Sequence, residues 1–189
     1  FNVPAGKPIL FQALDEHGMA YQTMRSLTFV QPGERTSCVG CHEHRMSTPP
    51  ASADLPLALR RPASTIDPGK LGGRPFGFVE VVQPVLDRHC VRCHGKDDKL
   101  NLTAQPHRGF THSYTALCQL PYDWRQLRGH PERLDDALVP RFAQRNQIQF
   151  TPPGGRYGAR GSELMQLLRD GHEGVELSDH ELYRLATWI

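Results

Sequence analysis

The chain has 189 residues, of which 38% are hydrophobic, 22 are Lys or Arg and 20 are Asp or Glu. This near-neutral charge gives no electrostatic surface for nucleic acid, so we expect no nucleic-acid partner. The apolar runs are far shorter than the roughly 20 residues that a bilayer requires, so we expect no membrane span. The 17 glycines and 16 prolines exceed the usual share of about 12%, which indicates many loops and a small core completed by a metal, disulfides or a large cofactor.

The first part of the chain, to about residue 75, is expected to contain β-structure. Residues 7–14 and 19–30 alternate in character as strands do, and the sequence DEHG at residues 15–18 predicts the turn of a hairpin. Residues 49–75 are rich in proline and show no sustained period. This composition predicts a linker or a loop that lies over a surface.

The second part, residues 76–189, is expected to be α-helical. Apolar residues recur at helical spacing over residues 81–86, and further helical pieces are expected within residues 113–128. SELMQLLRDG, at residues 162–171, starts with an N-cap serine and ends with glycine, and SDHELYRLATWI, at residues 178–189, starts with a capping box. The predicted fold class is α+β, with a small β-containing domain and long Pro-rich loops followed by an α-helical domain.

A five-residue motif, Cys-x-x-Cys-His, occurs twice, as CVGCH at residues 38–42 and as CVRCH at residues 90–94. Two cysteines at this spacing can present both sulfurs to one edge of a porphyrin, and the histidine that follows can reach the iron. The motif is typical of covalently bound haem c. The residues predicted to hold two haem c groups are the cysteines and histidines of the motifs: Cys38, Cys41, His42, Cys90, Cys93 and His94.

Other roles for the cysteines are less favoured. Two Cys-x-x-Cys pairs can form a zinc site, but such pairs are usually about 15 to 20 residues apart, whereas 48 residues separate Cys41 and Cys90. A redox dithiol would need a βαβ unit, which the pattern does not show, and disulfides would leave the histidines unexplained. The fifth cysteine, Cys118, has apolar neighbours and is expected to be packed in the core.

The second axial ligand of each iron must come from elsewhere in the chain, or that position stays open. His172 lies in a glycine-flanked loop before the last predicted helix, and we predict that it binds the second iron opposite His94. A solvent-exposed loop histidine is the alternative. For the first iron the candidate is Met24 on a strand, with a packing role as its alternative. An open position at the first iron would allow chemistry there.

Residues 6–45, GKPILFQALDEHGMAYQTMRSLTFVQPGERTSCVGCHEHR, resemble the haem-bearing middle domain of the hydrazine synthase alpha subunit and its homologues in large secreted planctomycete proteins. Residues 81–189, from VVQPVLDRHCVRCHG through LMQLLRDGHEGVELSDHELYRLATWI, are similar to the cytochrome c domain that follows it. The resemblance implies two haems c, the second bound by two histidines and serving as an electron relay. In hydrazine synthase the histidine of the first motif binds zinc, and a tyrosine four residues later binds the iron. Met46 stands at that position here, which favours ordinary ligation by His42 in a homologue with another task.

The predicted function is electron transfer by a dihaem c-type cytochrome module that forms part of a larger secreted redox protein. One alternative is a catalytic dihaem unit, in which an open first haem acts on a small nitrogen or oxygen substrate as in hydrazine synthase. Another is an interaction domain stabilised by its haems. The predicted partners are a redox protein or further haem domains, and oligomerisation is left open. Haem c is attached outside the cytoplasm, so a periplasmic or extracellular location is expected.

Overall fold

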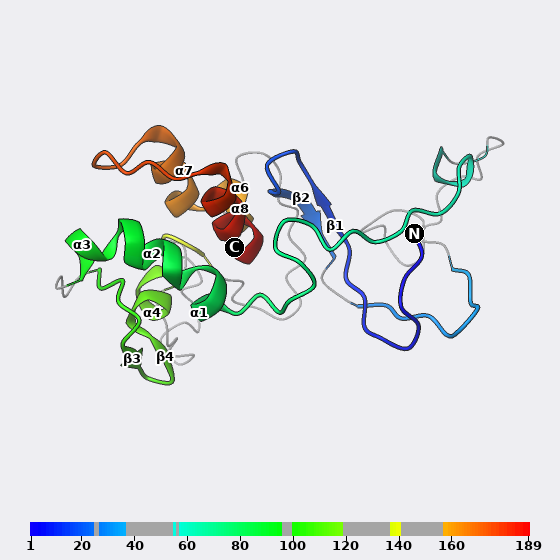
Figure 1. Cartoon of the computed structure of the whole chain (residues 1–189), viewed down its shortest axis with the longest axis horizontal. Helices are drawn as coiled ribbons and strands as arrows, with labels where there is room; N and C mark the ends of the chain where they lie inside the picture. Colours follow the sequence, from blue (N-terminus) through cyan, green and yellow to red (C-terminus); the bar gives the residue numbers. More distant parts are fainter. Residues whose placement is uncertain (25–26, 37–54, 56, 96–99, 119–136, 141–156) are drawn as a thin grey trace, which may run out of the picture. The chain divides into compact units, whose positions relative to one another are not determined.

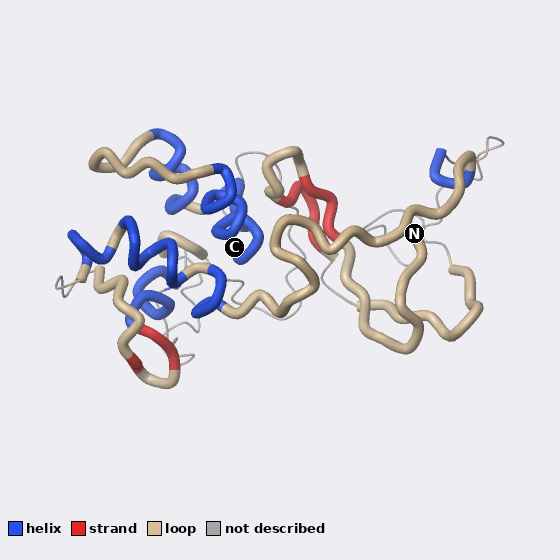
Figure 2. The backbone as a smooth tube through the Cα atoms, viewed as in Figure 1, coloured by secondary structure: helices blue, strands red, loops and turns tan. Residues whose placement is uncertain are grey.

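The computed structural model describes residues 1–24, 27–36, 55, 57–95, 100–118, 137–140 and 157–189. It contains short helices and two small two-stranded sheets, so the predicted α+β class is confirmed (Figures 1 and 2). The chain divides into two compact units, one of residues 1–12 and 23–73 and the other of residues 13–22 and 74–189. The domain boundary expected near residue 75 stays a prediction.

The first unit is built on extended chain with few paired residues. Ile9 and Thr28 form an antiparallel bridge, in which each N–H donates to the other residue's carbonyl at 2.7 and 3.0 Å. Among the described residues of this unit, Val30 is the one buried apolar side chain. A short 3-10 helix, η1, spans Leu57–Leu59. Residues 37–54 lie outside the described part of the chain. This range includes the first motif and the start of the predicted proline-rich segment.

An apolar face of the first unit is open to solvent. Leu10, Leu27 and Phe29 are each one residue away from a member of the Ile9–Thr28 bridge, so they lie on the opposite side of the bridged chains from that pair. Their exposed fractions are 54%, 58% and 57%. Contiguous exposed apolar side chains of this kind are typical of a surface that binds another group.

The predicted hairpin is formed by β1 (Gln12–Leu14) and β2 (Ala20–Thr23). Its turn depends on Asp15, whose carboxylate accepts hydrogen bonds from the N–H groups of His17 at 2.9 Å and Met19 at 2.8 Å. Asp stabilises turns in this way because its short side chain reaches the backbone two residues further on. The turn at residues 15–18 is therefore confirmed.

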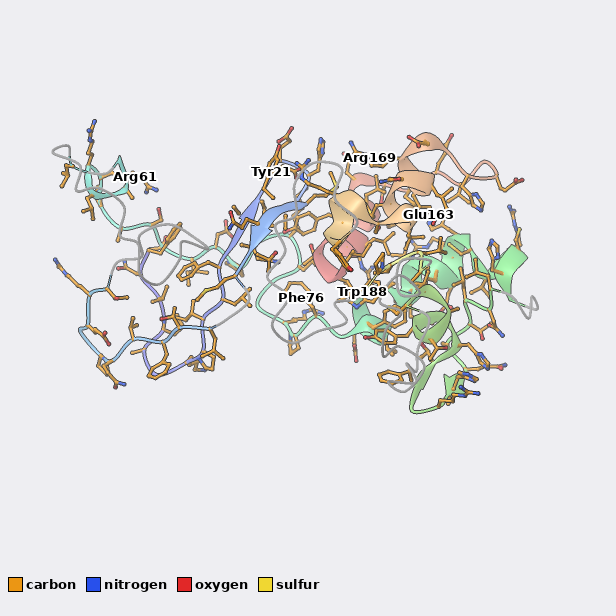
Figure 3. All side chains as sticks on the ribbon, turned by 180° about the vertical axis from the view of Figure 1, so that it is seen from behind. Tyr21, Arg61, Phe76, Glu163, Arg169 and Trp188 are labelled. Carbon is orange, nitrogen blue, oxygen red and sulfur yellow. The ribbon has the colours of Figure 1, made fainter. Side chains whose placement is uncertain are left out.

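The tip of this hairpin packs within the second unit. Gly18 has a φ of 79°, and a Cβ at this position would lie 2.6 Å from the Tyr183 ring. Asp15 forms a largely buried ion pair with Arg160. The Arg160 guanidinium carbon lies 3.7 Å from the centre of the ring of Tyr21, the residue labelled on this hairpin in Figure 3. The hairpin tip thus contributes side chains to the packing of the helical unit.

Three short helices open the main part of the second unit: α1 (Phe78–Val81), α2 (Gln83–His89) and α3 (Val91–His94). Pro84 occupies the first turn of α2, where its missing N–H costs no helical hydrogen bond. The apolar residues predicted to face the core of this region are buried: Val81, Val82, Val85 and Leu86.

A small hairpin of β3 (Pro106–His107) and β4 (Phe110–Thr111) follows and leads into α4 (His112–Cys118). α4 is the described part of the helical pieces predicted over residues 113–128. Residues 119–136 lie outside the described part of the chain. The rest of that prediction is therefore untested.

The next helices are α6 (Gly158–Gly161) and α7 (Glu163–Asp170). The Oγ of Ser162 accepts a hydrogen bond from the N–H of Met165 at 3.1 Å, so Ser162 is the N-cap of α7, as predicted. Gly171 ends the helix with a φ of 95°. The predicted bounds of this helix are confirmed.

The last helix is α8 (Asp179–Trp188), which begins with the predicted capping box of Ser178 and Glu181. Near its other end, the Trp188 ring packs edge-on against Phe78 of α1, with ring centres 4.9 Å apart. This contact joins the two ends of the helical region, as Figure 1 shows for α1 and α8. No described helix has the length and apolar character that a membrane crossing requires.

Candidate functional site

The second Cys-x-x-Cys-His motif lies at the junction of α2 and α3. Cys90 is the N-cap of α3, and its carbonyl accepts hydrogen bonds from the N–H groups of Cys93 at 3.1 Å and His94 at 2.9 Å. Residues three and four positions apart on a helix share a face. The two thiols and the imidazole therefore belong to one side of a single helical turn.

The two thiols of this motif are available for covalent bonds. Cys90 is half-buried, Cys93 is exposed, and neither forms a disulfide with another cysteine of the described residues. Burial, with a smaller contribution from the Cys93 thiol, raises the pKa of Cys90 above its ordinary value. The Cys90 thiol is therefore protonated at neutral pH.

The rings of His94 and His172, predicted as the two axial ligands of one iron, lie close to each other and nearly parallel. Their ring centres are 6.2 Å apart and their ring planes differ by 18°. His172 is half-buried in the loop between α7 and α8, where its carbonyl accepts a hydrogen bond from the N–H of Val175 at 2.8 Å. The Nδ1 of His94 is buried and has no hydrogen-bond partner in the described part of the chain.

The separation of these two rings fits one metal atom with an imidazole on each side. An imidazole nitrogen binds a first-row metal at about 2.0 Å, and its ring centre lies about 1.1 Å further away. Two imidazoles on opposite sides of the metal would thus have ring centres about 6.2 Å apart. His94 and His172 have this separation. Their role as ligands stays a prediction.

The predicted residues of the first site are described only in part. Cys38, Cys41 and His42 lie outside the described residues, so their attachment and ligand roles stay predictions. Met24 follows β2 directly, is half-buried, and donates its N–H to the carbonyl of Phe11 at 2.9 Å. Ligation of the first iron by Met24 also stays a prediction.

The other cysteine and histidines of the described chain have more ordinary surroundings. Cys118 ends α4 and is fully buried, as expected for a thiol packed in the core. His180 is exposed in the first turn of α8. His107 and His112 stack at the β3–β4 hairpin with ring centres 4.2 Å apart. Within the described ranges, no three or more His, Cys, Asp or Glu side chains form a group that could hold a metal ion.

A polar cluster that the sequence did not predict lies directly before the second motif. One oxygen of the Glu181 carboxylate accepts hydrogen bonds from Arg88 Nη1 at 2.7 Å and His89 Nε2 at 3.0 Å. The other oxygen accepts from the N–H of Ser178 at 3.0 Å and from its Oγ at 2.8 Å. We call these four residues, Arg88, His89, Ser178 and Glu181, the Glu181 cluster. The predicted capping box contains Ser178 and Glu181, and no sequence signal indicated Arg88 and His89.

The stability of the chain should depend on the charge of Glu181 at low pH. The hydrogen bond from His89, followed by those from Ser178, lowers the pKa of Glu181 from 4.5 to about 2. A carboxylate with a lowered pKa stabilises the folded chain fully above its unfolded-state value, and this contribution disappears as the pH falls through the folded-state value. We therefore expect the free energy of unfolding to fall more steeply between pH 4.5 and about 2 in the wild-type chain than in Glu181→Gln. Urea unfolding at several pH values measures both slopes, and equal slopes would contradict the bonding of Glu181.

The beginning of the chain is similar to a known protein family. Residues 1–43 match the family model described as the hydrazine synthase alpha subunit middle domain. The match covers a little under a quarter of the chain and includes the first motif, Cys38, Cys41 and His42. No curated protein and no solved structure matches the chain. Over its first 43 residues, the chain is therefore similar to a domain of the hydrazine synthase alpha subunit.

Proposed function

We propose that this chain is a dihaem c-type cytochrome module that transfers electrons. The observation that supports the proposal is the separation of the His94 and His172 rings, whose centres are 6.2 Å apart and whose planes differ by 18°. The residues proposed to hold the second haem c are Cys90, Cys93, His94 and His172. Those proposed for the first haem c are Cys38, Cys41 and His42, with Met24 as the candidate second ligand.

The imidazole pair supports an iron that is bound on both faces. A porphyrin supplies four nitrogen ligands in one plane, so one imidazole on each side completes six ligands. An iron with both axial positions filled can exchange single electrons and has no open position for a substrate. This chemistry favours electron transfer at the second motif.

The same distance argues against zinc between these two histidines. Zinc in proteins is almost always tetrahedral, and two imidazoles at a tetrahedral angle on one ion would have ring centres only about 5 Å apart. The ring centres of His94 and His172 are 6.2 Å apart. An arrangement with the imidazoles on opposite sides of a metal fits this separation better, and haem iron binds its axial ligands in that way.

Two observations support a haem in the first unit. The family match over residues 1–43 includes all three residues of the first motif. In addition, Leu10, Leu27 and Phe29 form an exposed apolar face on the bridged chains of this unit. A haem has a large apolar surface, and its burial against such a face would stabilise a unit that has little core of its own.

The family match also favours a second candidate function, catalysis at the first haem. The matched model describes a domain of hydrazine synthase, so this part of the chain is related to part of an enzyme. In a catalytic unit the first iron would keep one position open for a small nitrogen or oxygen substrate, and the second haem would supply electrons. Ligation by Met24 would fill that position instead. The two candidate functions therefore differ at the sixth position of the first iron.

The proposed cofactors imply a location and a kind of partner. Haem c is attached outside the cytoplasm, so we propose a periplasmic or extracellular location. Electron transfer requires a donor and an acceptor, which would be a redox protein or further haem domains.

Absorption spectra with and without carbon monoxide distinguish the two candidates. If both irons have two axial ligands, the oxidised and reduced chain should give low-spin spectra that carbon monoxide leaves unchanged. Binding of carbon monoxide by one of the two haems in the wild-type chain would instead support catalysis at the first haem. An unchanged spectrum in Met24→Ala would remove Met24 as a ligand, and a chain without haem would contradict both candidates.

A further inference from the structure

We propose that the Glu181 cluster holds the His172 ring near that of His94 and thereby keeps the second iron closed to external ligands. This inference rests on the proposed function, because it requires a haem at residues 90–94. It makes Glu181 a positioning residue, which acts through α8 and the loop that precedes this helix.

The Glu181 cluster connects the two chain segments that carry the imidazoles. His89 immediately precedes Cys90 of the motif, and Ser178 ends the loop that follows α7 and contains His172. Glu181 bonds to both His89 and Ser178, although it is 92 residues away from His89 in the sequence. A single carboxylate therefore fixes the end of this loop relative to the start of the motif.

The loop that carries His172 depends on its anchored ends. Gly171, Glu173 and Gly174 have φ values of 95°, 48° and 70°, and the N–H of Val175 donates to the carbonyl of His172. The positive φ of Glu173 is unfavourable for a residue other than glycine. The loop therefore needs support from its neighbours to keep this conformation. The Glu181 cluster provides that support at the α8 end.

A second polar anchor of α8 provides a matched control. Arg184 donates from Nε to the carbonyl of Val81 and from Nη2 to the carbonyl of Glu80, both at 2.8 Å. This contact holds α8 against the end of α1. Arg184 lies about one helical turn after Glu181 and is therefore further from the loop. Its hydrogen bonds do not involve the residues next to the motif. Loss of Arg184 should therefore weaken the docking of α8 without freeing the loop.

A glutamine cannot replace Glu181 in this cluster. Both oxygens of Glu181 accept hydrogen bonds, and the residue is only 7% exposed. In Glu181→Gln an NH₂ group would replace one of the two oxygens and would face hydrogen-bond donors. The negative charge that pairs with Arg88 would also be lost. We expect the start of α8 and the loop to move away from α2 while Arg184 and Trp188 keep the rest of α8 in place.

The test compares carbon monoxide binding by four reduced holoproteins: wild type, Glu181→Gln, Arg184→Gln and His172→Ala. His172→Ala defines full opening of the second iron, and any carbon monoxide bound at the first haem is common to all four proteins. We expect the binding constant for carbon monoxide at the second haem to be about tenfold higher in Glu181→Gln than in wild type. Arg184→Gln should unfold at a lower urea concentration and bind carbon monoxide no better than wild type.

Two results would overturn the positioning role. One is unchanged carbon monoxide binding in Glu181→Gln whose circular dichroism shows retained helix. The other is an equal increase in carbon monoxide binding in Arg184→Gln, because any loosening of α8 would then be enough to open the second iron. If Glu181→Gln does not fold, His89→Leu replaces it, since it removes one donor from α2 and should give a smaller increase in binding. An unchanged His89→Leu would then overturn the role.

Other results would reject the proposed function rather than the role of the Glu181 cluster. A chain without haem at residues 90–94, or a His172→Ala variant that binds no carbon monoxide at this haem, would reject the ligand assignment itself. If His172→Ala opens the iron and Glu181→Gln does not, the haem assignment stands and only the role of the Glu181 cluster is rejected.

Discussion

Replacement of His172 by alanine is expected to open the second iron without removing its haem. Cys90 and Cys93 would still attach the porphyrin and His94 would still bind one face, while the other face would lose its imidazole. Reduced His172→Ala should therefore bind one more carbon monoxide per chain than wild type. The oxidised variant should show high-spin absorption bands that wild type lacks. Optical titration of the reduced protein with carbon monoxide measures the first change, and the absorption spectrum of the oxidised protein measures the second.

His180→Ala is the matched control for this variant. His180 is an exposed histidine in the first turn of α8, close in sequence to His172, so its loss should leave the spectrum unchanged. Free imidazole added to His172→Ala should restore the low-spin spectrum, because it can occupy the vacated position. A low-spin spectrum of His172→Ala without added imidazole would show that another group binds the iron.

Replacement of both Cys90 and Cys93 by alanine is expected to remove the covalently bound haem of the second motif. Without thioether bonds, a haem at this site would be held by its iron ligands alone and would be lost on denaturation. The intact mass of the chain should then fall by one haem. The helical unit should also unfold at a lower temperature, because a group that binds the folded state stabilises it. Mass spectrometry and thermal unfolding measure these changes.

Cys118→Ala controls for the loss of a thiol from the same unit. Cys118 is fully buried in α4 and belongs to neither motif. Its replacement should leave two haems on the chain and cost about 1 kcal/mol of stability, as is usual for a small deletion in a core. If the Cys90 and Cys93 double variant kept two covalent haems, these cysteines would not be the attachment site.

The helices predicted best are those whose ends are encoded locally. Ser162 and Gly171 bound α7, and Ser178 with Glu181 caps α8. Each of these signals spans a few residues and needs no distant partner, because it satisfies the hydrogen bonds that a helix end leaves open. The place of His172 in a loop between two helices could be predicted for the same reason.

The strands were predicted longer than the structure has them. The alternating pattern extends over residues 7–14 and 19–30, whereas β1 and β2 cover Gln12–Leu14 and Ala20–Thr23. Alternation indicates extended chain, but it does not say which residues find a hydrogen-bonded partner. Pro8 has no N–H to donate, and the described residues around it form only the isolated Ile9–Thr28 bridge and a hydrogen bond from the N–H of Gly6 to the carbonyl of Val30.

Contacts between distant residues could not be predicted. Asp15 pairs with Arg160 across 145 residues, and His89 bonds to Glu181 across 92 residues. Charged residues of these types are mostly solvated at protein surfaces, so their presence in a sequence indicates no partner. The capping box predicted one role of Glu181. Its second role depends on the hydrogen bonds from Arg88 and His89 at the end of α2, which a local pattern does not contain.

The number of covalently bound haems per wild-type chain is the most direct test of the proposed function. The chain would be produced in cells that attach haem c, then denatured and analysed by intact mass spectrometry and by the absorption of its haem in pyridine. We predict two haems per chain, both retained after denaturation. A colourless chain with all thiols free, or a chain that carries only zinc, would contradict haem attachment at both motifs.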